Sequence, residues 1–90
     1  IMEPSNMTAG RKAVVSMTLT HETGVLSALL QTISGMGCSV LTITQSLPIH
    51  ERASVTISLD ISSLTSDIEQ LLQEMGERPG VDNIRLVAVE

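Results

Sequence analysis

The chain has 90 residues, a formal charge of −5 and no Phe, Tyr or Trp. This length allows one small domain, and an apolar fraction of 42% excludes a wholly disordered chain. No apolar run reaches the roughly 18 residues that a membrane helix needs. An acidic chain without aromatic rings is also poorly suited to nucleic acid. With a single cysteine and no internal disulfide, we expect a cytoplasmic protein without a membrane or nucleic-acid partner.

Residues 1–11 contain Pro4 and Gly10 and show no hydrophobic period, so we interpret them as an N-terminal tail or linker. We expect the domain to span residues 12–90. Because the chain opens with Ile1 rather than methionine, we also expect it to be a piece of a longer protein.

Strict alternation of apolar and hydroxyl residues from Lys12 onward predicts a half-buried strand. Val15, Met17 and Leu19 form its inward face. The segment HETG at residues 21–24 then interrupts the pattern. There we expect the side chain of Glu22 or Thr23 to cap the following helix.

The spacing of apolar residues over 25–36 predicts the first helix. Its apolar stripe consists of Val25, Leu26, Leu29, Leu30, Ile33 and Met36. We expect Gly35 and Gly37 to end it, as glycine does at a left-handed C-terminal cap.

Branched residues over 39–49 predict a second strand, although its alternation is imperfect. Gln45 falls in phase with the apolar residues, which either a bulge or an interface would explain. Pro48 is tolerated mainly in edge strands, so we place this strand at the side of its sheet.

A polar connection at residues 50–52 leads to a third strand over 53–61, which alternates as regularly as the first. The second helix is predicted over 66–77, because Ser66 and Glu69 have the spacing of a capping box. Its apolar stripe consists of Ile68, Leu71, Leu72 and Met75. Gly76, Pro79 and Gly80 end this helix, and the last strand covers 81–89.

The order strand, helix, strand, strand, helix, strand predicts an α+β fold. Each helix has one apolar stripe and the strands have one apolar face, so two layers bury all of them. A parallel sheet would show continuous apolar runs instead. We therefore expect a ferredoxin-like βαββαβ sandwich with a four-stranded antiparallel sheet and both helices on one face.

No catalytic or metal-binding pattern is present in the sequence. His21, Cys38 and His50 are not at metal-ligand spacings. Cys38 has no nearby base to lower its pKa and is interpreted as a small buried residue. The acidic residues are scattered and the arginines are spread along the chain. We expect no catalytic residue, no metal and no cofactor, and hence no enzyme.

The remaining candidate is the segment HETGVL at residues 21–26. It is either an ordinary helix start or a loop whose free amides and positive helix terminus bind a carboxylate. The residues alone do not distinguish the two.

From about Lys12 to Val89, the predicted order of elements and the segments HETGVL and SVLTIT resemble an ACT domain. The usual loop has an acidic residue, a basic residue, Pro or Ser, Gly, any residue and Leu. Those positions are filled here by His21, Glu22, Thr23, Gly24, Val25 and Leu26. The usual second strand opens with Asn-Ile and a further Ile, where this chain has Ser39, Val40 and Ile43. His21 and Ser39 thus depart from the usual pattern.

The phrases LTITQSLPI and VTISLDI resemble the C-terminal ACT domain of PheB-type proteins, which are associated with chorismate mutase. They are also similar to the C-terminal ACT segment of certain homoserine dehydrogenases. This resemblance favours a role in the chorismate–prephenate pathway of aromatic amino-acid biosynthesis, with the homoserine dehydrogenase-type enzyme as the alternative.

The resemblance implies a regulatory domain that binds a free amino acid at a homodimer interface and modulates a biosynthetic enzyme. The second strands of two copies would pair edge to edge. The ligand would lie between the loop of one copy, residues 21–26, and Ser39 and Val40 of the other. The alternative is an ACT-like dimerisation domain without a ligand.

Overall fold

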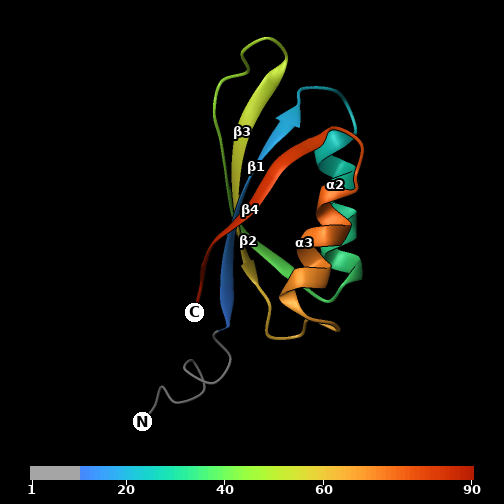
Figure 1. Cartoon of the computed structure of the whole chain (residues 1–90), viewed down its shortest axis with the longest axis vertical. Coiled ribbons are helices and arrows are strands. Elements are labelled where there is room, and N and C mark those ends of the chain that lie inside the picture. The colour runs from blue at the N-terminus through green and yellow to red at the C-terminus, as the bar shows by residue number, and fades with distance from the viewer. Residues whose placement is uncertain (1–10) are drawn as a thin grey trace.

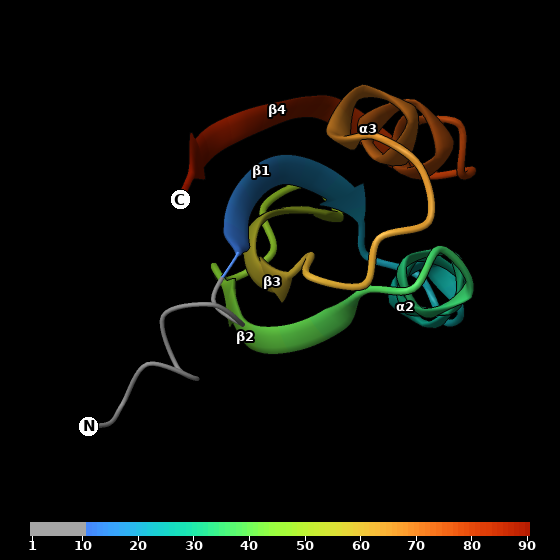
Figure 2. The same cartoon turned by 90° about the horizontal axis from the view of Figure 1, so that it is seen from below.

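The computed structural model describes residues 11–90. Its elements, in chain order, are β1 (Lys12–Thr20), α2 (Val25–Gly35), β2 (Ser39–Gln45), β3 (Arg52–Asp60), α3 (Ile68–Gly76) and β4 (Val81–Val89). The strands form one sheet in the order β2-β3-β1-β4, and every neighbouring pair is antiparallel. Both helices cover the same face (Figures 1 and 2). The ferredoxin-like fold expected from the sequence is confirmed.

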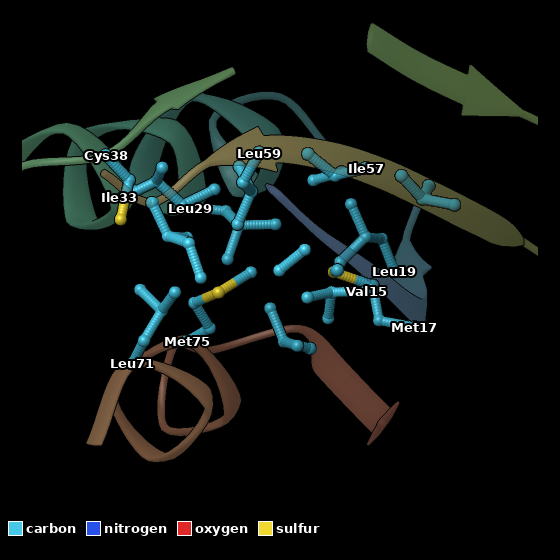
Figure 3. Packing of buried hydrophobic residues seen from close by; sticks show 14 residues of the cluster. Val15, Met17, Leu19, Leu29, Ile33, Cys38, Ile57, Leu59, Leu71 and Met75 are labelled. Carbon is cyan, nitrogen blue, oxygen red and sulfur yellow. The ribbon is translucent and has the colours of Figure 1, made fainter. Parts of the chain in front are cut away.

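The core lies between this face and the two helices, as Figure 3 shows. Alternate residues of β1 and β3 are buried, so the alternation in the sequence identified the inward face correctly. Among the described residues, no polar or charged side chain is buried. The buried cluster consists of Ala13, Val15, Met17, Leu19, Leu29, Ile33, Cys38, Val55, Ile57, Leu59, Ile61, Leu71, Met75 and Val81.

Helix α2 ends in a Schellman motif around Gly37. The Gly37 amide donates to the carbonyl of Ser34 at 3.1 Å, and the Cys38 amide donates to the carbonyl of Ile33 at 3.2 Å. Gly37 has a φ of 89°, and a Cβ there would collide with the Ser63 carbonyl. The expected role of Gly37 is confirmed, whereas Gly35 is the last residue of the helix itself.

The predicted caps of both helices were wrong. In α3, Asp67 rather than Ser66 is the N-cap, and its carboxylate accepts from the Gln70 amide at 2.8 Å. This carboxylate lies one residue nearer the helix, so α3 begins at Ile68. In α2, the N-cap is Gly24 in a left-handed conformation, and no side chain caps the helix.

Strand β2 is an edge strand, as expected, and its irregular alternation comes from a bulge at Leu41. Val40 pairs with Leu59, and the next pair is Thr42 with Ser58, so Leu41 is the extra residue. The bulge brings Ile43 and Gln45 onto the face that carries the helices.

The predicted second strand was too long, because the ladder with β3 ends at Gln45. Beyond it the Ser46 hydroxyl accepts from the Ser54 amide at 3.0 Å, and Pro48 has no amide to donate. The Ser46 amide still donates to the Ser54 carbonyl at 2.9 Å, and the next pairing is the isolated bridge between Ile49 and Arg52. This bridge closes a turn with two residues of positive φ, His50 and Glu51.

Candidate ligand-binding site

The loop between β1 and α2 is tethered from two sides. The Thr20 amide donates to the carbonyl of Gly80 at 2.8 Å, which ties the loop to the α3–β4 connection. The His21 amide donates to the carbonyl of Glu51 at 2.6 Å, which ties it to the β2–β3 turn. The loop therefore has a fixed position at one end of the sheet.

The first turn of α2 faces this loop without a side-chain cap and without an acidic residue. Helix N-termini carry amides with no partner inside the helix and a partial positive charge. A Cβ on Gly24 would meet no atom within 4 Å, so the space above the N-cap is open. A carboxylate can approach the first-turn amides through this space.

A small hollow of about 50 Å³ lies beside the loop. It is lined by Leu19, Thr20, His21, Glu22, Leu26, Gln45 and Ala53. Such a volume holds no more than a few water molecules. One copy of the domain therefore forms only a small hollow here, which lacks the walls to enclose a larger molecule.

The structure gathers only part of the predicted ligand-binding set. His21, Glu22 and Leu26 line the hollow, and Thr23 and Gly24 lie exposed beside it. Val25 turns away, because its methyl groups lie against Gly80 and the core.

Ser39 and Val40 lie at the opposite end of the sheet from the loop. Ser39 pairs with Asp60 on β3, whereas Thr20, at the loop, has its β3 partner at Arg52. At about 3.3 Å per residue, the eight steps from Arg52 to Asp60 span roughly 26 Å. Within one chain these two residues do not belong to the hollow.

Four residues of the hollow were not predicted from the sequence: Leu19, Thr20, Gln45 and Ala53. The sequence pattern could have pointed to Gln45, because it is the polar residue that falls in phase with the apolar face of its strand. The bulge at Leu41 sets this phase, and the sequence does not specify a bulge. Ala53 is buried beneath the hollow, where a small side chain leaves room.

The described residues hold no group of three or more His, Cys, Asp or Glu side chains arranged to bind a metal ion. Cys38 is buried, and desolvation, followed by the charge of Asp60, raises the pKa of its thiol. A protonated, buried thiol is a poor nucleophile. In residues 11–90, no helix is long and apolar enough to cross a bilayer.

A family model described as "ACT domain" matches residues 11–82. The chain belongs to the ACT domain family. Curated relatives include a UPF0735 ACT domain-containing protein of Lacticaseibacillus paracasei, 45% identical over 82 residues that cover 91% of this chain and 57% of the relative. Another, from Clostridium perfringens strain SM101, is 42% identical over 90 residues that cover 100% of this chain and 62% of the relative. This ACT domain thus spans about 60% of the length of these relatives.

Solved structures of other proteins share the fold at low sequence identity. The ACT domain of GTP pyrophosphokinase from Chlorobium tepidum superposes with a TM-score of 0.64 at 11% identity, covering 84% of this chain and 96% of that one. An ACT domain protein from Streptococcus pneumoniae gives a TM-score of 0.64 at 20% identity, covering 86% and 90%. The regulatory subunit of aspartate kinase from Thermus thermophilus gives a TM-score of 0.56 at 15% identity, covering 86% of this chain and 51% of that one.

Proposed function

We propose that this chain is a regulatory ACT domain, without catalysis of its own, that binds a free amino acid beside the β1–α2 loop. The observation that carries the proposal is the hollow at this loop, next to the uncapped first turn of α2. The ligand's α-carboxylate accepts from the first-turn amides, and the partial charge of the helix favours the anion. The carboxylate of Glu22, on the wall of the hollow, is available to the α-ammonium group.

A second copy of the chain completes the site. Within residues 11–90 the outer edge of β2 is unpaired, and Leu41 and Ile43 on it are 47% and 38% exposed. If two β2 strands pair antiparallel about Thr42, Ser39 of one copy lies opposite Gln45 of the other. Gln45 lines the hollow, so this pairing brings Ser39 and Val40 of the second copy to the place where walls are lacking.

The regulated enzyme belongs to amino-acid biosynthesis in this proposal, and the chorismate–prephenate pathway is favoured. Its support is the resemblance of LTITQSLPI and VTISLDI to PheB-type ACT domains. The runner-up is a homoserine dehydrogenase-type enzyme, on the same segments. A regulatory role is consistent with the regulatory subunit named among the structural neighbours. We place the protein in the cytoplasm, the usual compartment of such enzymes.

The test is a dye-based thermal melt against each of the twenty amino acids. Because ligand that binds only the folded state raises its stability with concentration, one or a few amino acids should raise Tm progressively. The matched variants are Gly24→Asn and Gly35→Ala. Asn tolerates the left-handed backbone of Gly24 and puts a side chain in the open space above the N-cap, so the rise should vanish. Gly35→Ala lies away from the hollow and should keep it.

The second candidate is a dimerisation domain without a ligand, favoured by the exposed apolar edge of β2. In that case no amino acid at millimolar concentration changes Tm, while the chain still dimerises. A response that survives in Gly24→Asn with unchanged affinity would instead place the ligand elsewhere.

A further inference from the structure

The face of the sheet without helices carries a larger groove, of about 460 Å³. Ser16 and Thr18 of β1 form its floor. Ser54 of β3 borders it on one side, and Asn83 and Arg85 of β4 border it on the other. The side chains of Ser16, Thr18 and Ser54 are small, so the middle of this face leaves a hollow that larger side chains would fill.

A bulge in β4 brings Asn83 and Arg85 to the groove. Ser16 pairs with Arg85 and Thr18 with Asp82, so two β4 residues lie opposite Met17 alone. Ile84, the second of them, turns to the helix face beside Gly76. Asn83 has a φ of 55°, a backbone conformation that asparagine tolerates better than most residues.

The polar groups of the groove have no partner in the described part of the chain. The hydroxyls of Ser16, Thr18 and Ser54 make no side-chain hydrogen bond there. The amide of Asn83 and the guanidinium of Arg85 make none either. Five neighbouring groups able to donate thus converge on one hollow.

Among residues 11–90, Arg85 is the one cation lining the groove, and no ion pair involves it. Asp82 is the acidic residue nearest to it, and the Arg52 guanidinium holds its carboxylate at 2.6 Å. This ion pair crosses β1 at one end of the groove, since Arg52 pairs with Thr20 and Asp82 with Thr18. Lys12 and Asp60, also on this face, lie opposite each other on β1 and β3 at the far end of β1, next to Glu90, whose amide donates to the Lys12 carbonyl. Arg85 keeps its charge free for a ligand.

We propose that this groove binds the carboxylate of a small molecule, with Arg85 as the main anchor. A guanidinium offers a planar fork that matches a carboxylate, and the hydroxyls and the Asn83 amide supply further donors. One positive charge balances one carboxylate. A phosphate carries about −1.5 to −2 at neutral pH and would be left partly uncompensated on this acidic chain. This site lies on the opposite face of the sheet from α2 and does not depend on the proposed amino-acid site.

The test is an NMR titration of the ¹⁵N-labelled chain with sodium lactate, and separately with sodium phosphate, at constant ionic strength. We expect lactate to shift the amides of Ser16, Thr18, Ser54, Asn83 and Arg85 together. Arg85→Gln should weaken the lactate Kd about tenfold, as expected for loss of a charge-assisted pair. Lys12→Gln, which removes the same charge from the same face, should change Kd less than about twofold, since screening limits distant charges.

Two further variants keep the test decisive. Asn83→Gly preserves the positive φ and removes one donor, so it should weaken lactate binding even if Arg85→Gln fails to fold. Gly24→Asn should leave the lactate-induced shifts of the groove amides unchanged, which separates this proposal from the amino-acid site. Equal effects of Lys12→Gln and Arg85→Gln, or shifts spread over all the surface cations, would overturn it. Tighter binding of phosphate at the same residues would overturn the assignment to a carboxylate.

Discussion

Two glycines at the end of α2 differ in what the backbone requires of them. Gly35 is the last residue of the helix, and a Cβ there would meet no atom within 4 Å. Gly37 has a φ of 89°, and a Cβ there would collide with a backbone carbonyl of the β3–α3 connection. The sequence indicates that the helix ends near this pair, but only the structure separates the replaceable glycine from the required one.

We therefore expect Gly35→Ala to stabilise the domain by about 0.5–1 kcal/mol, since alanine loses less backbone entropy in a helix. Gly37→Ala should destabilise it by a larger amount, because both the φ value and the contact oppose a side chain. Urea denaturation followed by far-UV circular dichroism measures both, as the chain has no aromatic residue. Similar effects of the two substitutions would contradict this assignment.

Asp60 gives a pH-dependent contribution at the residue scale. The Ser62 amide donates to its carboxylate at 2.9 Å, and this bond, with further help from the Ser62 side chain and Lys12, lowers the pKa of Asp60 from its ordinary 3.8. Because folding lowers this pKa, ionised Asp60 stabilises the domain at pH values above its ordinary pKa. This stabilisation is lost as the pH falls through the lowered pKa.

Asp60→Asn should accordingly be less stable than the wild type at neutral pH. The difference in the free energy of unfolding should shrink as the pH falls below 3.8. A series of urea denaturations from neutral to acidic pH measures it. If the difference stays constant with pH, the charge of Asp60 contributes nothing.

At the scale of the elements, regular patterns were predicted well and their ends poorly. Burial of one face produces the alternation in β1 and β3 and the apolar stripes of α2 and α3. These patterns are therefore visible in the sequence. The end of β2 depends on a hydrogen bond to the Ser46 hydroxyl, and the start of α3 depends on which of two neighbouring polar residues caps it. Such choices depend on local geometry, which residue spacing does not determine.

The β2–β3 turn offers a test at this scale. Its two central residues, His50 and Glu51, have φ values of 53° and 65°, as a type I′ turn requires. Neither residue type favours this conformation, whereas Asn-Gly does. The double change His50→Asn, Glu51→Gly should stabilise the domain by about 1 kcal/mol or more. The single change Ile49→Val, next to the two central residues of the turn, serves as the control. An unchanged or lower unfolding midpoint in the double variant would refute the argument.

At the scale of the whole molecule, the fold was predictable and the candidate site only in part. The loop from His21 to Leu26 was recognised from its resemblance to the ACT pattern, and it does border a hollow. Gln45 was seen as an irregularity but not assigned, because its face depends on the bulge. Ser39 and Val40 would become neighbours of the loop only in the proposed dimer, which a single chain does not specify.

The proposed pairing through β2 predicts which edge of the sheet controls assembly. Ile43→Lys should reduce dimerisation, because a charged side chain on a pairing edge disfavours strand addition. Val87→Lys changes an exposed apolar residue of β4, at the other edge, and should leave the dimer intact. Sedimentation equilibrium distinguishes the two, with Tm as a check on folding. Loss of the dimer in Val87→Lys alone would move the interface to β4.

The pairing of the first and last strands also determines how the domain responds to mechanical force. β1 and β4 are adjacent and antiparallel, with Ala13 opposite Val89, so both ends of the domain leave the sheet at the same point (Figure 1). Tension applied through the ends would load the hydrogen bonds one after another rather than all at once. The bond from the Glu90 amide to the Lys12 carbonyl, at 2.9 Å, would break first. We expect β4 to separate from β1 at low force. A force transmitted through this domain would therefore unfold the domain before it displaced a mechanically more stable neighbouring domain.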